Sequence, residues 1–134
     1  MSLRKRLIAA AAAVGIVGAA GVVAATPAYA AWDSCASGQM CAYVDANGGG
    51  PAMRAYYSNS SWNGSWGNYN NSASSIWNNG NSQNVNVYVN QNYSGSNFTV
   101  YRGTGNRHTD LYWDQTGGVG IAFWNDNLES NLWT

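Results

Sequence analysis

The sequence predicts an all-β protein made of two Greek-key motifs that pack together as a sandwich. The main observation is an internal repeat, in which residues 43–50 (YVDANGGG) resemble residues 88–95 (YVNQNYSG), 45 positions later. No stretch after the N-terminal segment keeps a helical period, and turn-forming residues recur about every 8 to 12 positions, as in β sandwiches. We therefore expect one domain over residues 31–134, with a first key at about 35–80 and a second at about 84–127.

The N-terminal segment has the pattern of a secretory signal peptide. A basic triplet at residues 4–6 (RKR) precedes an apolar stretch at residues 7–25, and small residues flank a cleavage position in AYA at residues 28–30. An uncleaved membrane anchor is the less favoured alternative, because alanine and glycine dominate the apolar stretch. We expect residues 1–30 to be removed and the remaining protein to be extracellular, with no membrane association after cleavage.

Charge counting disfavours a polyanionic partner. Without the signal segment three arginines stand against five aspartates and one glutamate, so the mature net charge is 3 − 6 = −3. A domain that binds nucleic acid normally carries a basic patch, and we therefore expect no nucleic-acid partner.

Cys35 and Cys41 are the two cysteines of the chain, and they predict a disulfide in an oxidising compartment. Closing so short a loop stabilises the fold by roughly 2 kcal/mol in the chain-entropy account. The competing interpretation is a metal site, which needs four ligands, whereas the chain offers these two thiols and His108.

The first copy of the repeat predicts a hairpin followed by a long loop. Residues 40–44 and 52–57 read as two strands joined by a glycine turn at residues 48–50. The loop at residues 58–70 is rich in Ser, Asn and Gly, but its aromatic residues indicate that it folds back over the sheet. A short strand is expected at residues 75–78.

The second copy predicts a clearer hairpin. Valines at positions 85, 87 and 89 alternate with polar or amphipathic residues, and residues 97–101 continue the same period of two. Further short strands are expected at residues 111–113 and 120–125. We expect one shared core, made of Val85, Val87, Val89, Phe98, Val100, Ile76 and Trp77.

These residues resemble the β/γ-crystallin fold, whose keys carry an aromatic residue, four residues, a second aromatic residue, one residue and a glycine. Tyr88, Tyr93 and Gly95 fit that pattern, whereas the first copy has Gly48 in place of the second aromatic residue. Residues 70–75 (NNSASS) match the calcium clamp of that family. The resemblance implies a weak Ca²⁺ site, on the order of 10⁻⁴ M, with candidate ligands Asn70, Asn71, Ser74 and, from the second hairpin, Asn90.

The alternative for residues 70–75 is structural. Their serines could satisfy backbone groups of the turn, and their asparagines could adopt positive φ. The stretch contains no carboxylate, and residues 114–119, taken as its counterpart in the second key, lack both serine hydroxyls. Both interpretations remain open from the sequence.

A second resemblance is to the secreted bacterial metalloproteinase-inhibitor family. It rests on residues 35–41 (CASGQMC), the following tyrosine, residues 45–49 (DANGG) and residues 74–77 (SSIW), and it covers most of residues 32–125. It implies a protein that blocks a secreted metalloproteinase. In the best understood member the protease-facing site lies near a second disulfide, and this chain has no cysteine after Cys41, so no reactive residue can be carried over.

Residues 102–110 are therefore a positional candidate for the inhibitory contact, with Arg102, Arg107 and His108 as its charged or titratable members. As a lone histidine in a polar loop, His108 is expected to be a solvated surface residue. It has no nucleophile or paired carboxylates beside it in sequence, and we expect a protein that is not an enzyme.

Three other functions compete with inhibition. The calcium clamp favours a calcium-binding envelope, spore-surface or cell-wall-associated protein. Trp62, Trp66 and Trp113 lie among Asn and Gly and could stack on wall polysaccharide if exposed. A secreted antimicrobial toxin is the third alternative. In each case we expect a monomer.

Overall fold

The protein is described by a computed structural model that covers residues 31–64 and 67–134. The predicted signal peptide and Trp66 lie outside the described residues. Within the described ranges there is no α-helix, and the regular structure consists of short antiparallel sheets and three short 3-10 helices, η1 (Ala31–Ser34), η2 (Ala46–Gly48) and η3 (Thr104–Asn106). The predicted all-β class is confirmed.

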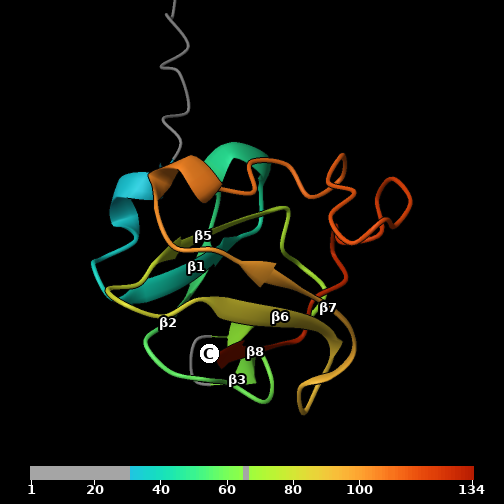
Figure 1. Cartoon of the computed structure of the whole chain (residues 1–134), viewed down its shortest axis with the longest axis horizontal. Coiled ribbons are helices and arrows are strands. Elements are labelled where there is room, and N and C mark those ends of the chain that lie inside the picture. The colour runs from blue at the N-terminus through green and yellow to red at the C-terminus, as the bar shows by residue number, and fades with distance from the viewer. Residues whose placement is uncertain (1–30, 65–66) are drawn as a thin grey trace, which may run out of the picture.

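Each predicted key forms one three-stranded sheet (Figure 1). In the first sheet, β1 (Gln39–Tyr43) lies between β2 (Ala52–Ala55) and β5 (Ser75–Asn79). In the second, β6 (Val85–Asn90) lies between β7 (Ser94–Val100) and β8 (Ser130–Trp133). The two sheets therefore repeat one arrangement, in which the last strand of each key pairs with the first strand of the hairpin.

The third segment of each key crosses to the sheet of the other key. Asn59 and Asn131 exchange two backbone hydrogen bonds of 2.9 and 3.0 Å, and His108 and Ile76 exchange two of 2.9 Å. Asn59 belongs to the first key and pairs with β8, whereas His108 belongs to the second and pairs with β5. This reciprocal exchange confirms two Greek keys packed as a β/γ-crystallin-like sandwich.

The later part of the second key differs from the prediction, and the long loop of the first key contains a ribbon that was not predicted. Residues 111–113 and 120–125 are turns and not strands, because Gly117 and Gly118 have φ values of 82° and 76° and a hydrogen bond from Ala122 N–H to the Tyr112 carbonyl closes the chain on itself. The last strand is β8, which extends the second sheet past the boundary near residue 127 expected from the sequence. A small ribbon of β3 (Asn63–Gly64) and β4 (Gly67–Asn68) lies within the long loop of the first key.

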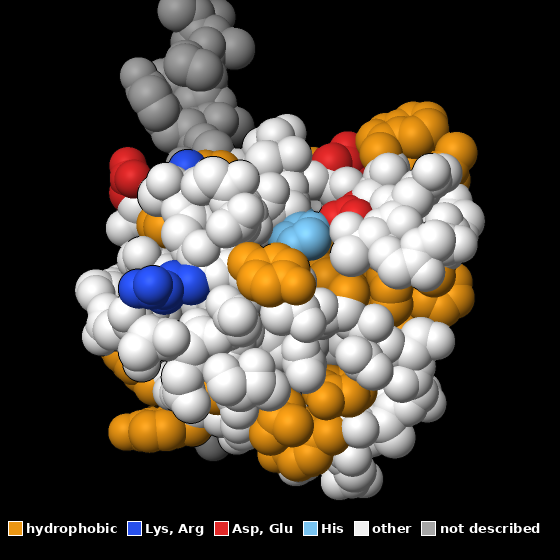
Figure 2. Space-filling model, in the orientation of Figure 1, with side chains coloured by type: hydrophobic (Ala, Val, Ile, Leu, Met, Phe, Trp, Pro, Cys, Tyr) orange, Lys and Arg blue, Asp and Glu red, His pale blue; other side chains and the backbone are white. Residues whose placement is uncertain are grey.

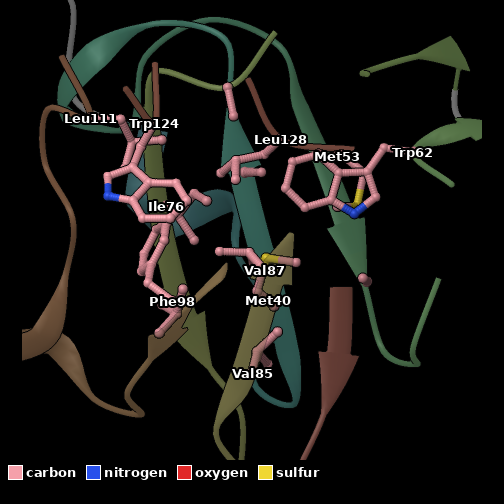
Figure 3. Close-up of a cluster of buried hydrophobic side chains, with 14 residues drawn as sticks. Met40, Met53, Trp62, Ile76, Val85, Val87, Phe98, Leu111, Trp124 and Leu128 are labelled. Atoms are coloured by element: carbon pink, nitrogen blue, oxygen red, sulfur yellow. The ribbon is translucent and has the colours of Figure 1, made fainter. Parts of the chain in front are cut away.

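The core between the sheets follows the alternation read from the sequence. Val85, Val87 and Val100 are fully buried, and Val89 packs against the same cluster while partly exposed. Figure 3 shows Val85 and Val87 among side chains from both keys, which include Met40, Met53, Trp62, Ile76, Phe98, Leu111, Trp124 and Leu128.

Trp77 was expected in this core and is not part of it. It packs in a second cluster with Trp32, Tyr43 and the disulfide on the opposite face of the first sheet. Successive residues of a strand point to opposite faces, so Ile76 and Trp77 cannot both face the other sheet. Burial of Trp77 therefore comes from the N-terminal segment that covers this outer face.

The predicted disulfide is confirmed between Cys35 and Cys41, whose Cα atoms are 5.9 Å apart. It joins the segment after η1 to the middle of β1 and is buried beside Trp32 and Trp77. A domain of this size buries only about two thirds of its chain surface. The disulfide beside the aromatic cluster therefore adds stability to a fold whose hydrophobic core is small.

Candidate functional site

The clamp residues 70–75 lead into β5 and close the first hairpin. Ser75 Oγ donates to the Asp45 carbonyl at 2.7 Å and accepts from the Gly48 N–H at 2.9 Å. Ser74 N–H donates to the Tyr43 carbonyl at 2.8 Å, and Asn71 has a φ of 55°. These contacts match the structural alternative, in which the serines satisfy backbone groups of the turn. The Ser75 hydroxyl both donates and accepts in this role.

The true counterpart of this clamp is residues 125–130, and not residues 114–119 as expected. Ser130 Oγ donates to the Asn90 carbonyl at 2.6 Å, Glu129 N–H donates to the Tyr88 carbonyl at 2.9 Å, and Asp126 has a φ of 51°. Each contact repeats one made by the first clamp. Sequence comparison missed this stretch because Glu129 replaces the first serine of the pattern.

The two clamps meet across the interface between the keys. Asn71 Nδ2 donates to Glu129 Oε1 at 2.6 Å, and Asn70 Oδ1 is buried without a hydrogen-bond partner. The structure thus places a carboxylate beside the first clamp, which the clamp sequence itself lacks. The Asn90 carbonyl accepts its hydrogen bond from Ser130 Oγ of its own key. Within residues 31–64 and 67–134, no three His, Cys, Asp or Glu side chains are grouped closely enough to hold a metal ion.

The charged residues of the 102–110 segment are held against the first key. The Arg107 guanidinium lies over Trp77 at 4.1 Å and over Trp32 at 5.1 Å from the ring centroids. Arg102 Nη1 donates to the Asn81 carbonyl at 2.7 Å. Arg107 is therefore a cation–π element that covers the disulfide cluster, whereas Arg102 remains exposed.

His108 is not the solvated residue expected from the sequence. It is mostly buried, its ring is tilted against Phe98 with centroids 4.8 Å apart, and its Nδ1 contacts Asp114 Oδ2. Burial would raise the pKa of Asp114, but hydrogen bonds from the Thr116 hydroxyl and N–H, together with the contact to His108, lower that pKa below its ordinary value. The pair is a structural brace at the base of a long loop.

That loop, residues 111–126, carries three exposed large apolar side chains, and Tyr101, which is 58% exposed, precedes it in the same key. Trp113 is 65% exposed, Ile121 51% and Tyr112 44%, and the rings of Tyr112 and Trp113 meet edge to face. Trp62, by contrast, is fully buried and donates from Nε1 to Asn131 Oδ1 at 2.9 Å. Of the tryptophans proposed to stack on sugars, Trp62 is excluded, Trp113 is exposed and Trp66 lies outside the described residues.

A groove of about 360 Å³ lies along the free edge of the first sheet. Its lining is apolar or neutral except for Arg54, which donates from Nε and Nη2 to Ser34 at 3.1 and 2.9 Å. The residues that line it are Gln39, Ala52, Arg54, Tyr56, Tyr57 and Asn59. No carboxylate or histidine lines this groove, so it does not provide an acid–base pair.

Taken together, the exchanged keys and paired clamps define a β/γ-crystallin-type domain. The chain is similar to a beta gamma crystallin from Ciona intestinalis, with 22% identity and a TM-score of 0.54, over 72% of this chain and 100% of that chain. It is also similar to a betagamma-crystallin from an archaeon, with 17% identity and a TM-score of 0.54, over 74% of this chain and 100% of that chain. A third similar structure, from a study of the evolution of the eye lens beta-gamma-crystallin domain fold, has 17% identity and a TM-score of 0.59, over 74% of this chain and 87% of that chain. These identities establish a shared fold alone.

The sequence profile of peptidase inhibitor family I36 matches residues 28–100, more than half of the chain, and the protein belongs to this family. The matched range ends with β7, so the 111–126 loop lies beyond it. No curated protein matches the chain. Among the described residues, no helix has the length and apolar character needed to cross a membrane.

Proposed function

We propose that this chain is a secreted inhibitor of an extracellular peptidase, with a metalloproteinase as the first target. The observation that carries the proposal is the match of residues 28–100 to peptidase inhibitor family I36. We expect a protein that binds and does not catalyse, and within the described residues the pair of His108 and Asp114 is mostly buried and braces the long loop.

The mechanism is steric occlusion by a rigid domain. Two hairpins closed by Ser75 and Ser130, a buried disulfide and the exchange of segments between the keys all restrict the backbone. A loop held by such a scaffold loses little conformational entropy when it enters a cleft, so more of its contact energy appears as affinity. The same rigidity would slow cleavage of the inhibitor by its target.

The test is inhibition of a panel of metallo-, serine and cysteine peptidases by protein recovered from the medium of cells that express the full chain. Calcium is kept at a fixed excess so that calcium-dependent peptidases stay active. We expect inhibition of a metalloproteinase in a fixed molar ratio, with the inhibitor intact afterwards. Mass spectrometry of the recovered protein checks secretion, with an N-terminus at Ala31 expected. Full activity of every peptidase in the presence of excess intact protein would overturn the proposal.

A second candidate function is calcium binding by an envelope, spore-surface or wall-associated protein. It is favoured by one arrangement, the side-by-side placement of Asn71 and Glu129 next to the unpaired Asn70 Oδ1. Amide, hydroxyl and carboxylate oxygens are the ligands that Ca²⁺ prefers, and a carboxylate strengthens a weak extracellular site. Asn70, Asn71 and Ser74 remain the proposed ligands from the first clamp, and we add Glu129. Asn90 remains a candidate, and its carbonyl accepts from Ser130 Oγ.

Thermal unfolding with and without calcium tests this second function. If the dissociation constant is about 10⁻⁴ M, a calcium concentration of about 10 mM stabilises the fold by about 2.7 kcal/mol. We expect Glu129→Gln to lose most of this gain and magnesium to give little. Equal melting temperatures with calcium and with a chelator would remove the calcium function while leaving the inhibitor proposal intact.

A further inference from the structure

The 111–126 loop is the one long excursion of the second key. Its two ends are fixed on the first key by hydrogen bonds of 2.9 Å, from Leu111 N–H to the Ser74 carbonyl and from Asp126 N–H to the Ala73 carbonyl. The matching bonds in the first key start at Trp62 and Asn71, which encloses a shorter segment. In Figure 1 the longer loop projects beyond both sheets at the upper right.

Bonds within the loop hold it in one shape. Ala122 N–H donates to the Tyr112 carbonyl at 2.6 Å, and Trp124 Nε1 donates to the Thr116 carbonyl at 3.0 Å. Asp114 accepts from the Thr116 N–H at 2.9 Å and contacts His108, which is itself paired with β5. The loop is therefore preorganised, and ordering it costs little on binding.

The exposed large side chains of this braced loop are apolar or aromatic, and its exposed carboxylate, Asp126, stands at the C-terminal end of the loop and accepts from Asn125 Nδ2 at 2.8 Å. Tyr112, Trp113 and Ile121 are its exposed large side chains, whereas Asp110 and Asp114 bond within the segment. Figure 2 shows hydrophobic side chains at the upper right, where the loop lies in Figure 1, with acidic side chains between them and the histidine. Trp and Tyr are the side chains most enriched among the residues that dominate binding energy at protein interfaces.

We propose that the 111–126 loop is the surface that enters the cleft of the target peptidase, with Trp113, Tyr112 and Ile121 filling its apolar subsites. This inference rests on the proposed inhibitory function. It replaces Arg107 and His108 as contact candidates, because Arg107 packs over Trp77 and Trp32 and His108 braces the loop from below. A projecting, rigid and apolar loop is complementary to a concave cleft.

The ring geometry favours a protein partner over a polysaccharide. The planes of Tyr112 and Trp113 are 77° apart with centroids at 4.9 Å, so the two rings do not form a flat platform for successive sugars. Ile121 adds an aliphatic group that offers no hydrogen bond to a sugar hydroxyl. The loop also lies outside the residues matched by the family profile, where a feature specific to the target of this chain is expected.

The test compares inhibition constants of single variants against the peptidase that the native protein inhibits. Trp113→Ala is expected to weaken inhibition by about 30-fold or more, Tyr112→Ala by about 5-fold or more, and Trp113→Phe less than Trp113→Ala. The matched control is Tyr57→Ala, a tyrosine that is 81% exposed near the edge strand β2, and it should change inhibition by less than about 3-fold. All variants should melt within a few degrees of the native protein, because the truncated side chains are exposed.

The outcomes separate the two levels of the proposal. Inhibition by the native protein that survives both loop substitutions within about 3-fold overturns the loop assignment and leaves the inhibitory function standing. No inhibition of any peptidase by the native protein overturns both. If Trp113→Ala abolishes co-sedimentation with insoluble cell-wall polysaccharide but leaves inhibition unchanged, the loop is a sugar-binding surface and the assignment to the peptidase is wrong.

Discussion

At the scale of single residues, three side chains that the sequence offered as contact candidates are held in place by other residues of the fold. Arg107 lies over two indole rings, His108 contacts Asp114, and Trp62 is buried with its Nε1 bonded to Asn131. The partners of Arg107 and Trp62 are distant in sequence, whereas Asp114 lies six positions from His108. Charge and aromaticity in a loop are therefore poor guides to exposure in this protein, since a leucine-poor domain must build its core from aromatic residues.

The Asp114 carboxylate gives a prediction with a definite pH dependence. Its pKa is lower in the folded protein, so its stabilising contribution is fully present above the ordinary aspartate pKa of about 3.9 and is lost as the pH falls through the folded value. We expect Asp114→Asn to reduce the free energy of unfolding by about 1 to 2 kcal/mol at pH 7. Urea unfolding of both proteins measures the difference, which should shrink below about pH 4. A difference that grows on acidification would contradict this.

At the scale of elements, the two hairpins are closed by the same device. Ser75 and Ser130 are both fully buried, each donates to a carbonyl of its hairpin, and each accepts from an N–H at the hairpin corner. Tyr93 has a φ of 58° at the position where the first hairpin has Gly48 with a φ of 73°, so one backbone shape is made with two different residues. A buried hydroxyl that serves two backbone groups is costly to remove.

We expect Ser75→Ala and Ser130→Ala each to lower the free energy of unfolding by about 1 to 3 kcal/mol, because each substitution leaves a buried carbonyl and an N–H without a partner. Chemical unfolding measures the change. The matched control is Ser94→Ala, where the hydroxyl is exposed and donates to the Gln91 carbonyl, and it should change stability by less than about 0.5 kcal/mol. If the two buried serines proved as tolerant as Ser94, the hairpins would be held by other contacts.

At the scale of the whole molecule, each key pairs its third segment with the sheet of the other key, and we expect the two keys to fold as one unit. Asn59 pairs with β8 and His108 with β5, and the buried Asn78 side chain donates from the first sheet to the Val100 carbonyl of the second at 3.0 Å. Neither sheet keeps all of its neighbours if the other unfolds. The disulfide, in contrast, lies within the first key and links the segment after η1 to the middle of β1.

Replacement of both cysteines by serine should therefore lower stability without dividing the transition. We expect a loss of roughly 2 kcal/mol from the larger freedom of the unfolded chain. Calorimetry should still show one cooperative transition with equal calorimetric and van't Hoff enthalpies. Two separate transitions would show that the keys fold independently, contrary to the role given to the exchanged segments.

Local patterns were sufficient for the parts of the protein that depend on near neighbours. The alternation of valines predicted β6 and its buried face, the repeat predicted two hairpins, and the spacing of Cys35 and Cys41 predicted their disulfide. The last strand was missed because Glu129 breaks the clamp pattern that precedes it. Ile76 and Trp77 were both assigned to one core, although they face opposite sides of the first sheet.

The sequence by itself thus determined the fold class, the hairpins and the covalent link, because turn chemistry, strand period and cysteine spacing act within a few residues. The tertiary structure decided which segments cross between the keys, that Asn71 meets Glu129, and that the 111–126 loop stands braced and apolar at one end. These contacts join residues tens of positions apart. Their pairing depends on how two similar sheets share a core, and no local pattern records that.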